Sequence, residues 1–211
     1  TKIYRGIGAF VSEDREDGNP WNVESGGEFH MSHDSELFKT KQSLENSGWE
    51  LNGNTFQKGD DRYLPLYESK LFHQYNHRFA TFEEVSEKNI KNGNAKRIPT
   101  KELDQRNKLV IPRYWIPEDE YQEKHTGDWH IGLRTITNAT NERTSISTIL
   151  PEVGAADSLS VLKGPSPEES LTLISLLNSF ALDYVLRQKL SGSNLNYYMI
   201  WQLPIPDPEK L

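Results

Sequence analysis

The chain has 211 residues, of which 35% are hydrophobic, and a net charge of −7; this length allows one large domain or two small ones. It contains no cysteine, which excludes a disulfide scaffold and a cysteine-ligated zinc site. No apolar run approaches the roughly 20 residues that a membrane-spanning helix needs, and Thr1–Phe10 lacks the apolar stretch of a signal peptide. We therefore expect a cytoplasmic protein with long polar loops and no membrane partner.

The first quarter of the chain predicts an irregular segment, a helix and a hairpin. Residues 1–33 are rich in Gly, Asp and Glu. A short helix is expected over Asp34–Gly48, with Thr40 as an N-cap and Gly48 as the glycine that ends it. Asn52-Gly53 tolerates the positive φ angles of a tight turn, so the residues on either side of it should pair as a β-hairpin.

Three strand-like runs follow, separated by a long polar stretch. Arg62–Tyr67 favours a strand, and Pro65 restricts that strand to an edge or a bulge. Arg78–Phe82 alternates polar and apolar residues and predicts a second strand. Residues 83–108 are charged and polar, which is typical of a long loop, a frayed helix or a disordered segment. Leu109–Ile116 is strand-like but is interrupted by a proline.

The middle of the chain predicts a short helix and two further strands. Pro117–Lys124 begins with proline and acidic residues, which suits the first turn of a helix. Trp129–Arg134 alternates in the manner of a half-buried strand, and Thr144–Leu150 is a second β-rich run. Residues 151–165 contain Gly, Ser and Pro and are expected to form a loop.

The last part of the chain predicts one long amphipathic helix. Ser166 can cap it, a proline and two acids follow, and Gly192 can end it. Between them, apolar residues recur every three or four positions: Leu171, Ile174, Leu177, Phe180, Ala181, Tyr184 and Val185. The order of elements lacks regular βαβ alternation, so the predicted fold class is α+β, with a mixed twisted sheet and a long C-terminal packing helix.

Motifs that would identify an enzyme are weak or missing. The sequence has no phosphate-binding loop, no dinucleotide-binding glycine motif and no nucleophile elbow. Asp61, Glu68 and Lys70 match the short pattern of metal-dependent nucleases, in which the acids hold Mg²⁺ and the lysine positions the attacking water. A pattern this short arises easily by chance. We therefore predict that this chain alone is not catalytic, with an Mg²⁺-dependent nuclease as the alternative.

Two segments carry residues that are typical of nucleic-acid contacts. Residues 88–113 contain eight Lys or Arg and only two acids, which suits either a phosphate-contacting face or a solvated loop. Arg134–Thr144 is dense in Arg, Asn and Thr. Arginine can pair with guanine and asparagine with adenine in the major groove, but a polar turn that bonds its own backbone has the same composition.

Three blocks resemble one protein family in order and spacing. The blocks span residues 34–82, 112–151 and 176–208. The third block reads LLNSFALDYVLRQKLSGSNLNYYMIWQLPIPDP. Together they are similar to the C-terminal specificity region of TaqI-like adenine-specific DNA methyltransferases, including single-chain restriction-modification proteins.

The resemblance implies a target-recognition module for phage defence that reads double-stranded DNA. It implies residues 1–33 as an irregular N-terminal segment, 34–165 as the recognition domain and 166–211 as a scaffold helix and connector. S-adenosylmethionine would belong to a methyltransferase domain of the same protein, a partner outside this chain, so no cofactor is expected here. The predicted DNA-contacting residues are Lys70, His73, Arg78, Arg113, Arg134, Asn138, Asn141 and Arg143.

Two features leave alternatives open. The net charge of −7 is unusual for a surface that binds DNA by itself, since neutralising phosphates supplies much of the affinity. Arg78 and Arg143 would equally suit strand residues that pair with neighbouring acids. A non-catalytic protein-interaction module, in which the apolar stripe of the final helix docks on another domain, is the second alternative.

Overall fold

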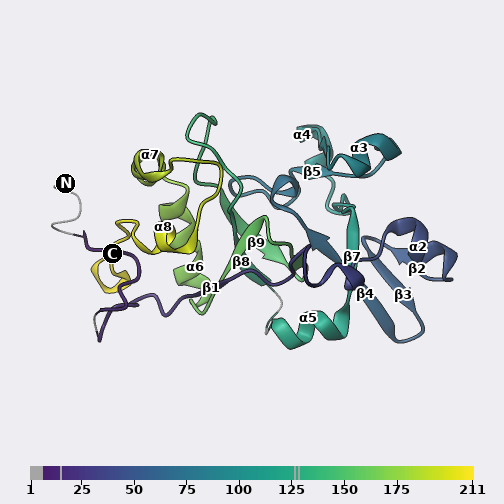
Figure 1. Ribbon diagram of the computed structural model, residues 1–211, viewed down its shortest axis with the longest axis horizontal. Coiled ribbons are helices and arrows are strands. Elements are labelled where there is room, and N and C mark those ends of the chain that lie inside the picture. Colours follow the sequence, from purple (N-terminus) through teal and green to yellow (C-terminus); the bar gives the residue numbers. More distant parts are fainter. Residues whose placement is uncertain (1–6, 15, 126, 128) are drawn as a thin grey trace.

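A computed structural model describes residues 7–14, 16–125, 127 and 129–211 and shows an elongated α+β fold (Figure 1). Helices α6, α7 and α8 gather at one end of the molecule, and helix α2 with the hairpin β2–β3 forms the other end. The predicted fold class is therefore confirmed at this level. Among the described residues, no helix has both the length and the apolar character that crossing a membrane requires.

Two larger sheets form the body of the molecule. In the first the strand order is β1-β11-β8-β9 and all pairs are antiparallel. Its strands are Glu24–Gly26, Leu159–Lys163, Trp129–Arg134 and Ser147–Pro151, in that order. The second has the order β10-β4-β3-β2, with β7 also paired to β4 and with β10 parallel to β4. Its strands are Gly154–Ala155, Asp61–Tyr67, Thr55–Lys58, Glu50–Asn52 and, for β7, Tyr114–Pro117.

Several local predictions are confirmed. Helix α2 spans Lys41–Asn46, and the Thr40 side chain accepts a hydrogen bond from the Ser43 amide as its N-cap. The preceding residues Ser35–Leu37 form a separate 3₁₀ turn, η1, so the expected single helix is two pieces. The hairpin forms at the predicted turn, where Gly53 has a φ of +64°. Helix α5 follows Pro117 over Glu118–Lys124.

The prediction that Pro65 lies at an edge or a bulge is wrong. Strand β4 is central, and Pro65 lies opposite Trp115 of β7. The amide and carbonyl of Trp115 bond to Lys39 on the other side of β7. The backbone of Pro65 therefore points away from β7. On that side, the pairing of β4 with β3 ends at Tyr63 and its pairing with β10 begins at Leu66. A residue without an amide hydrogen fits there because no strand needs one.

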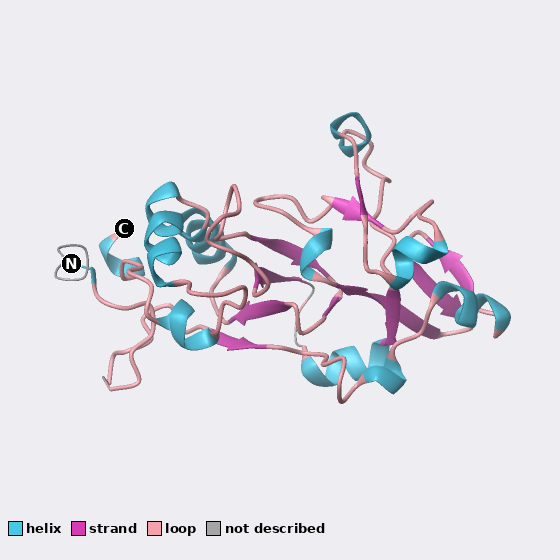
Figure 2. Ribbon diagram, turned by 45° about the horizontal axis from the view of Figure 1, so that its top comes forward, coloured by secondary structure: helices cyan, strands magenta, loops and turns pink. Residues whose placement is uncertain are grey.

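Two further segments contain regular structure. Residues 83–108 were expected to be a long loop, a frayed helix or a disordered segment, and residues 151–165 were expected to be a loop. Residues 83–108 include helix α3 (Glu87–Lys91), strand β6 and helix α4 (Thr100–Leu103). Strand β6 (Lys96–Arg97) pairs with β5 (Ala80–Thr81), all that forms of the strand predicted over Arg78–Phe82. We call residues 80–108 the arm, which projects from the body in Figure 2. Residues 151–165 supply β10 and β11, and β11 is a buried inner strand.

Strand β8 is almost fully buried where a half-buried strand was predicted. Its four central residues are all buried, since it lies between β11 and β9 and both faces of the sheet are covered. The strand predicted over Thr144–Leu150 begins only at Ser147. The segment expected to be irregular at the N-terminus contributes β1, which pairs with β11.

The long C-terminal helix is also a wrong prediction. The segment forms α6 (Pro167–Leu177), α7 (Phe180–Lys189) and α8 (Tyr197–Trp201). The capping box predicted at Ser166 is present. The helix ends at Asn178 because that side chain bonds to the backbone of Ser147: Oδ1 accepts from its amide at 3.0 Å and Nδ2 donates to its carbonyl at 2.9 Å. Ser179 then caps α7.

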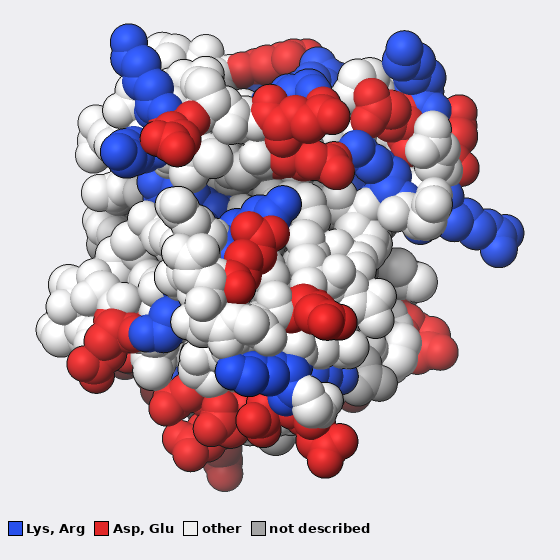
Figure 3. All heavy atoms as spheres, turned by 90° about the vertical axis from the view of Figure 1, so that its right-hand side faces the viewer, with Lys and Arg blue, Asp and Glu red and all other residues white. Residues whose placement is uncertain are grey.

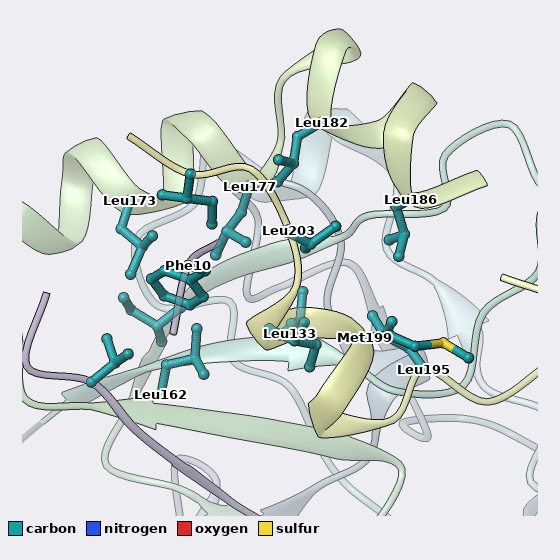
Figure 4. Packing of buried hydrophobic residues seen from close by; sticks show 14 of the residues in the cluster. Phe10, Leu133, Leu162, Leu173, Leu177, Leu182, Leu186, Leu195, Met199 and Leu203 are labelled. Atoms are coloured by element: carbon teal, nitrogen blue, oxygen red, sulfur yellow. The ribbon is translucent and has the colours of Figure 1, made fainter. Parts of the chain in front are cut away.

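The main core lies between the C-terminal helices and the first sheet (Figure 4). Phe10, from the N-terminal segment, points into it beside side chains of α6 and the sheet. Part of the predicted apolar stripe does not reach this core, since Leu171, Phe180 and Tyr184 are 63%, 82% and 64% exposed. The core residues on α6 and α7 are Leu173, Ile174, Leu177, Leu182 and Leu186.

Candidate nucleic-acid interface

Two of the predicted DNA-contacting residues are ion-pair partners of a buried acid at the end of β4. Arg113 donates to both carboxylate oxygens of Glu68, at 2.6 and 3.1 Å. Lys70 lies 3.2 Å from the same carboxylate. Arg113 also packs against the Tyr114 ring at 4.9 Å. Both cations thus have an acid partner inside the protein, and the single carboxylate of Glu68 offsets one of their two positive charges.

The residues of the nuclease pattern do not converge. Asp61 and Glu68 lie at opposite ends of β4, so the strand separates them by roughly 20 Å at about 3.3 Å per residue. A bridging Mg²⁺ would need ligands within about 2.1 Å. In the part of the chain that the structure describes, no group of three His, Cys, Asp or Glu side chains has a metal-binding arrangement.

Arg78 holds the arm in place. Its guanidinium donates to the carbonyl oxygens of Leu103, Gln105 and Lys108 at 2.8 to 3.1 Å. These acceptors lie at and after the C-terminal end of α4, where helix carbonyls are left without partners. Arg78 therefore has a structural role in this arrangement.

A tight turn projects beside these residues. His73 and Asn76 close it with two backbone hydrogen bonds, of 2.8 and 3.0 Å, so that Gln74 and Tyr75 form its tip. The side-chain amide of Gln74 donates to the Ser145 carbonyl at 2.8 Å, and the backbone amide of Tyr75 donates to the Ser147 carbonyl at 3.2 Å. The tip is thus tied to the segment that leads into β9.

Two guanidinium groups surround the aromatic ring of Phe79. Arg97 lies 5.2 Å from the ring centroid and Arg134 lies 5.8 Å from it. The His73 ring is 4.8 Å from the same centroid. Arg134 also donates to the Phe72 carbonyl. Among the described residues, neither arginine forms an ion pair with a carboxylate, so their positive charge is uncompensated.

Burial lowers the pKa values of Arg134 and His73 beside the Phe79 ring. It lowers the pKa of the Arg134 guanidinium to about 10, which still leaves the group positive at neutral pH. Burial, reinforced by Arg134, lowers the pKa of His73 below its ordinary value, although the nearby acid Glu142 acts in the opposite direction. His73 is therefore neutral at pH 7, and the arginines carry the positive charge.

Arg143 lies at the N-terminal end of α7. It packs against the exposed Phe180 ring at 4.4 Å, donates to the Asn178 carbonyl and lies 3.6 Å from Asp183. We use the name arginine face for Arg97, Arg134 and Arg143 together with His73, Phe79 and the Tyr75 turn. Of the predicted residues, the fold brings His73, Arg134 and Arg143 into this face and excludes Lys70, Arg78 and Arg113.

The two predicted asparagines occupy the loop between β8 and β9. Asn138 uses its side-chain oxygen to accept from the amide and hydroxyl of Thr140, both at 2.9 Å, which is a local turn. Asn141 is exposed, and its backbone amide donates to the backbone carbonyl of Asn138. Asn141 is therefore the asparagine that is more available to a partner.

Sequence reasoning missed Arg97 and a buried cluster near the start of β8, the strand that ends at Arg134. Arg97 was only one of many cations in residues 88–113. The histidine cluster, which we define as Glu28, His125, His130 and Lys163, joins segments that are far apart in sequence. Glu28 accepts from His125 and Lys163, each at 3.0 Å. The His125 and His130 rings lie 4.6 Å apart.

His130 has no hydrogen-bond partner on either ring nitrogen among the described residues. Burial lowers its pKa to about 3. Burial acts to raise the pKa of Glu28, but the hydrogen bond from His125 and the charge of Lys163 bring it below its ordinary value. This cluster is internally neutralised, and it ties the N-terminal segment to α5, β8 and β11.

The surface elsewhere mixes both signs of charge. On the face that carries α2 and the hairpin, acidic and basic side chains are interspersed, and acids gather along the lower edge of Figure 3. Four acids line a hollow of about 540 Å³ beside Arg62: Asp60, Asp61, Glu118 and Asp119. That surface would repel a polyanion.

Comparison with known proteins identifies no relative: no family model, no curated protein and no solved structure matches this chain.

Proposed function

We propose that this chain is a target-recognition module of a restriction-modification system, which binds double-stranded DNA through the arginine face. One observation carries the proposal. In a chain of net charge −7, Arg97 and Arg134 are held on an aromatic ring with no carboxylate to neutralise them, beside a projecting turn. The nearby cations Lys70 and Arg113, by contrast, share an acid partner, Glu68.

The energetics of Arg134 support an external anion. Burying a charge without a partner costs free energy, and this cost is what lowers the pKa of the guanidinium. Such an arrangement is more common at functional sites than elsewhere. DNA phosphates would supply the missing negative charge, and arginine forms charge-assisted bonds to phosphate with a planar, directional geometry.

The surrounding groups fit the same partner. Arg143 and the exposed Asn141 flank the face on the side of the β8–β9 loop. The arm contributes exposed cations on its helices, including Lys88, Lys91 and Lys101. On this proposal the catalytic groups and the S-adenosylmethionine site belong to a methyltransferase domain outside this chain. The family resemblance of the three sequence blocks favours that division.

Salt-dependent binding tests the proposal. A labelled duplex is titrated with the protein at several salt concentrations, and the logarithm of the association constant is plotted against the logarithm of salt concentration. We expect micromolar or weaker binding that falls steeply with salt, because each phosphate contact releases a counterion. Binding that ignores salt, or no binding at about 50 mM salt, would refute the proposal.

A pair of charge-matched variants locates the surface. Arg134→Met and Lys58→Met each remove one positive charge, but Lys58 lies on the distant hairpin, where it donates to the Ser47 carbonyl. We expect Arg134→Met to weaken binding about tenfold and to reduce the salt slope by about one contact, while Lys58→Met leaves both unchanged. Equal effects of the two variants would show non-specific attraction instead of a defined face.

A second candidate function is favoured by the apolar side chains that α6 and α7 leave exposed. Leu171 and Tyr184 are 63% and 64% exposed, and single exposed apolar residues usually mark an interface only when they form part of a larger patch. On this alternative the helices dock on the methyltransferase domain. Co-purification that Leu171→Asp with Tyr184→Asp abolishes, while DNA binding persists, would support it.

A further inference from the structure

The turn that carries Tyr75 is built to hold one side chain away from the body. Tyr75 is 63% exposed, whereas the neighbouring His73 and Arg134 are partly buried. The Asn76 side chain accepts from the Arg78 amide at 2.8 Å, and Gln74 is anchored to Ser145. The tip is therefore preorganised, and a partner would not have to order it.

The backbone of Tyr75 is strained in a way that glycine would avoid. Its φ is +58°, in the left-handed region that residues with a side chain seldom occupy. Strain of this kind persists where the surrounding structure enforces it, and it gathers at binding sites. Glycine at the tip would relieve both the strain and the exposure of an apolar ring, so the presence of tyrosine needs a use for its side chain.

The arginines of this face are not shaped for the same task. Arg134 is anchored to the Phe72 carbonyl and rests on Phe72 and Phe79. Arg143 is held by Asn178 and Asp183. Their charges stay at the level of the surface, where phosphates pass, and cannot extend into a groove that is about 8.5 Å deep. Tyr75 is 63% exposed and is the aromatic side chain of this face that is most open to a partner.

We propose that Tyr75 is a specificity-determining residue that enters a DNA groove and contacts base edges, while the arginines hold phosphates. This inference rests on the proposed DNA binding and deepens it. A narrow turn has the cross-section that the major groove admits. The tyrosine hydroxyl can donate to or accept from a base edge, and its ring can pack against a thymine methyl group.

Selection from a randomised duplex library tests the division of roles. Wild-type protein, Tyr75→Ala and the remote control Lys58→Met each select duplexes, and the enriched sequences are compared. We expect the wild type and the control to enrich the same motif, and Tyr75→Ala to lose the preference at one or two adjacent positions. Tyr75→Ala should bind the selected duplex about tenfold more weakly, yet bind unselected duplex within twofold of wild type with an unchanged salt slope.

Two further variants keep the outcome decisive. Tyr75→Gly suits the positive φ, so it reports the loss of the side chain without added backbone strain. Tyr75→Phe separates the hydroxyl from the ring. An unchanged motif with Tyr75→Ala and Tyr75→Gly overturns the inference while DNA binding stands. A wild type that binds no duplex overturns the proposed function as well.

Discussion

The histidine cluster and the arginine face are both gatherings of basic side chains, but they treat charge in opposite ways. In the histidine cluster a carboxylate lies at the centre, and Glu28 receives hydrogen bonds from His125 and Lys163. In the arginine face an aromatic ring lies at the centre, and no carboxylate pairs with Arg97 or Arg134 among the described residues. The first cluster contains its own counterion, whereas Arg97 and Arg134 in the second have none among the described residues.

The difference teaches that a count of cations does not locate a binding surface. Lys70 and Arg113 are as basic as Arg134 by composition, yet both have an acid partner, Glu68. Uncompensated charge beside exposed aromatic groups is the more informative signal.

The largest effect is expected from removing the central carboxylate of the histidine cluster. Glu28→Ala leaves Lys163 and His125 without their buried partner, and loss of one member of a buried ion pair destabilises by about 3–5 kcal/mol. Urea unfolding followed by circular dichroism measures this change. The control is Glu24→Ala on β1, an exposed position where we expect less than about 0.5 kcal/mol. A loss below about 1 kcal/mol for Glu28→Ala would contradict the role given to the cluster.

The next effect is a loss of stability in acid. The pKa of His130 falls from 6.5 to about 3 on folding, so the unfolded chain binds a proton in that range and the folded chain does not. Stability should therefore decrease as pH falls from about 6.5 toward 3, by up to about 1.4 kcal/mol per pH unit. The lowered pKa values of His73 and His77 act in the same direction.

A His130→Leu variant isolates the share of that side chain. It fills a similar space without a titrating group, so the slope of stability against pH between about 6.5 and 4.5 should become shallower. Carboxylates with lowered pKa values, such as Glu28 and Asp183, contribute their slope mainly below that window, where the unfolded chain begins to bind their protons. If His130→Leu has the wild-type slope, the assignment to His130 is wrong.

Arg134→Met should change stability little and in the opposite sense to Glu28→Ala. The side chain loses one hydrogen bond, to the Phe72 carbonyl, but it also loses a partly buried charge that has no acid partner. We expect a change within about 1 kcal/mol, either neutral or stabilising, because replacing unpaired polar groups by apolar ones relieves desolvation. Urea unfolding would show a loss above 2 kcal/mol if the arginine were mainly a structural residue.

The smallest effect concerns the nuclease pattern. Because β4 separates Asp61 from Glu68, we expect no cleavage of plasmid DNA with Mg²⁺ or Mn²⁺, and no difference between wild type and Lys70→Ala. Lys70→Ala should also cost less than about 1 kcal/mol, since its ion pair is partly exposed. Gel electrophoresis of plasmid after incubation is the measurement, and cleavage that disappears with Lys70→Ala would restore the nuclease alternative.

Local chemistry predicted local structure well. The Asn52-Gly53 turn, the Thr40 cap and the Ser166 capping box each depend on residues within a few positions of one another. The α+β class likewise follows from the order of patterns along the chain. These features need no knowledge of distant contacts, which is why the sequence sufficed for them.

Contacts between distant residues defeated the other predictions. Asn178 ends the expected helix because its partner is Ser147, 31 positions earlier. Arg113 looked available until Glu68, 45 positions away, was seen to hold it. Arg97 joins the arginine face only because the arm folds back and places it over the Phe79 ring. No periodicity or local motif records such pairings, and only the fold reveals which charges are left over.

The side chain that interrupts the C-terminal helices also has a consequence for how molecules meet in solution. Strand β9 is an edge strand of its sheet, and unpaired amides and carbonyls at an edge can pair with a strand from a second molecule. Asn178 occupies both groups of Ser147, and Asp183 takes the amides of Thr144 and Ser145. Two side chains thus imitate a neighbouring strand at the start of β9, and there they block the chain-to-chain pairing that begins aggregation.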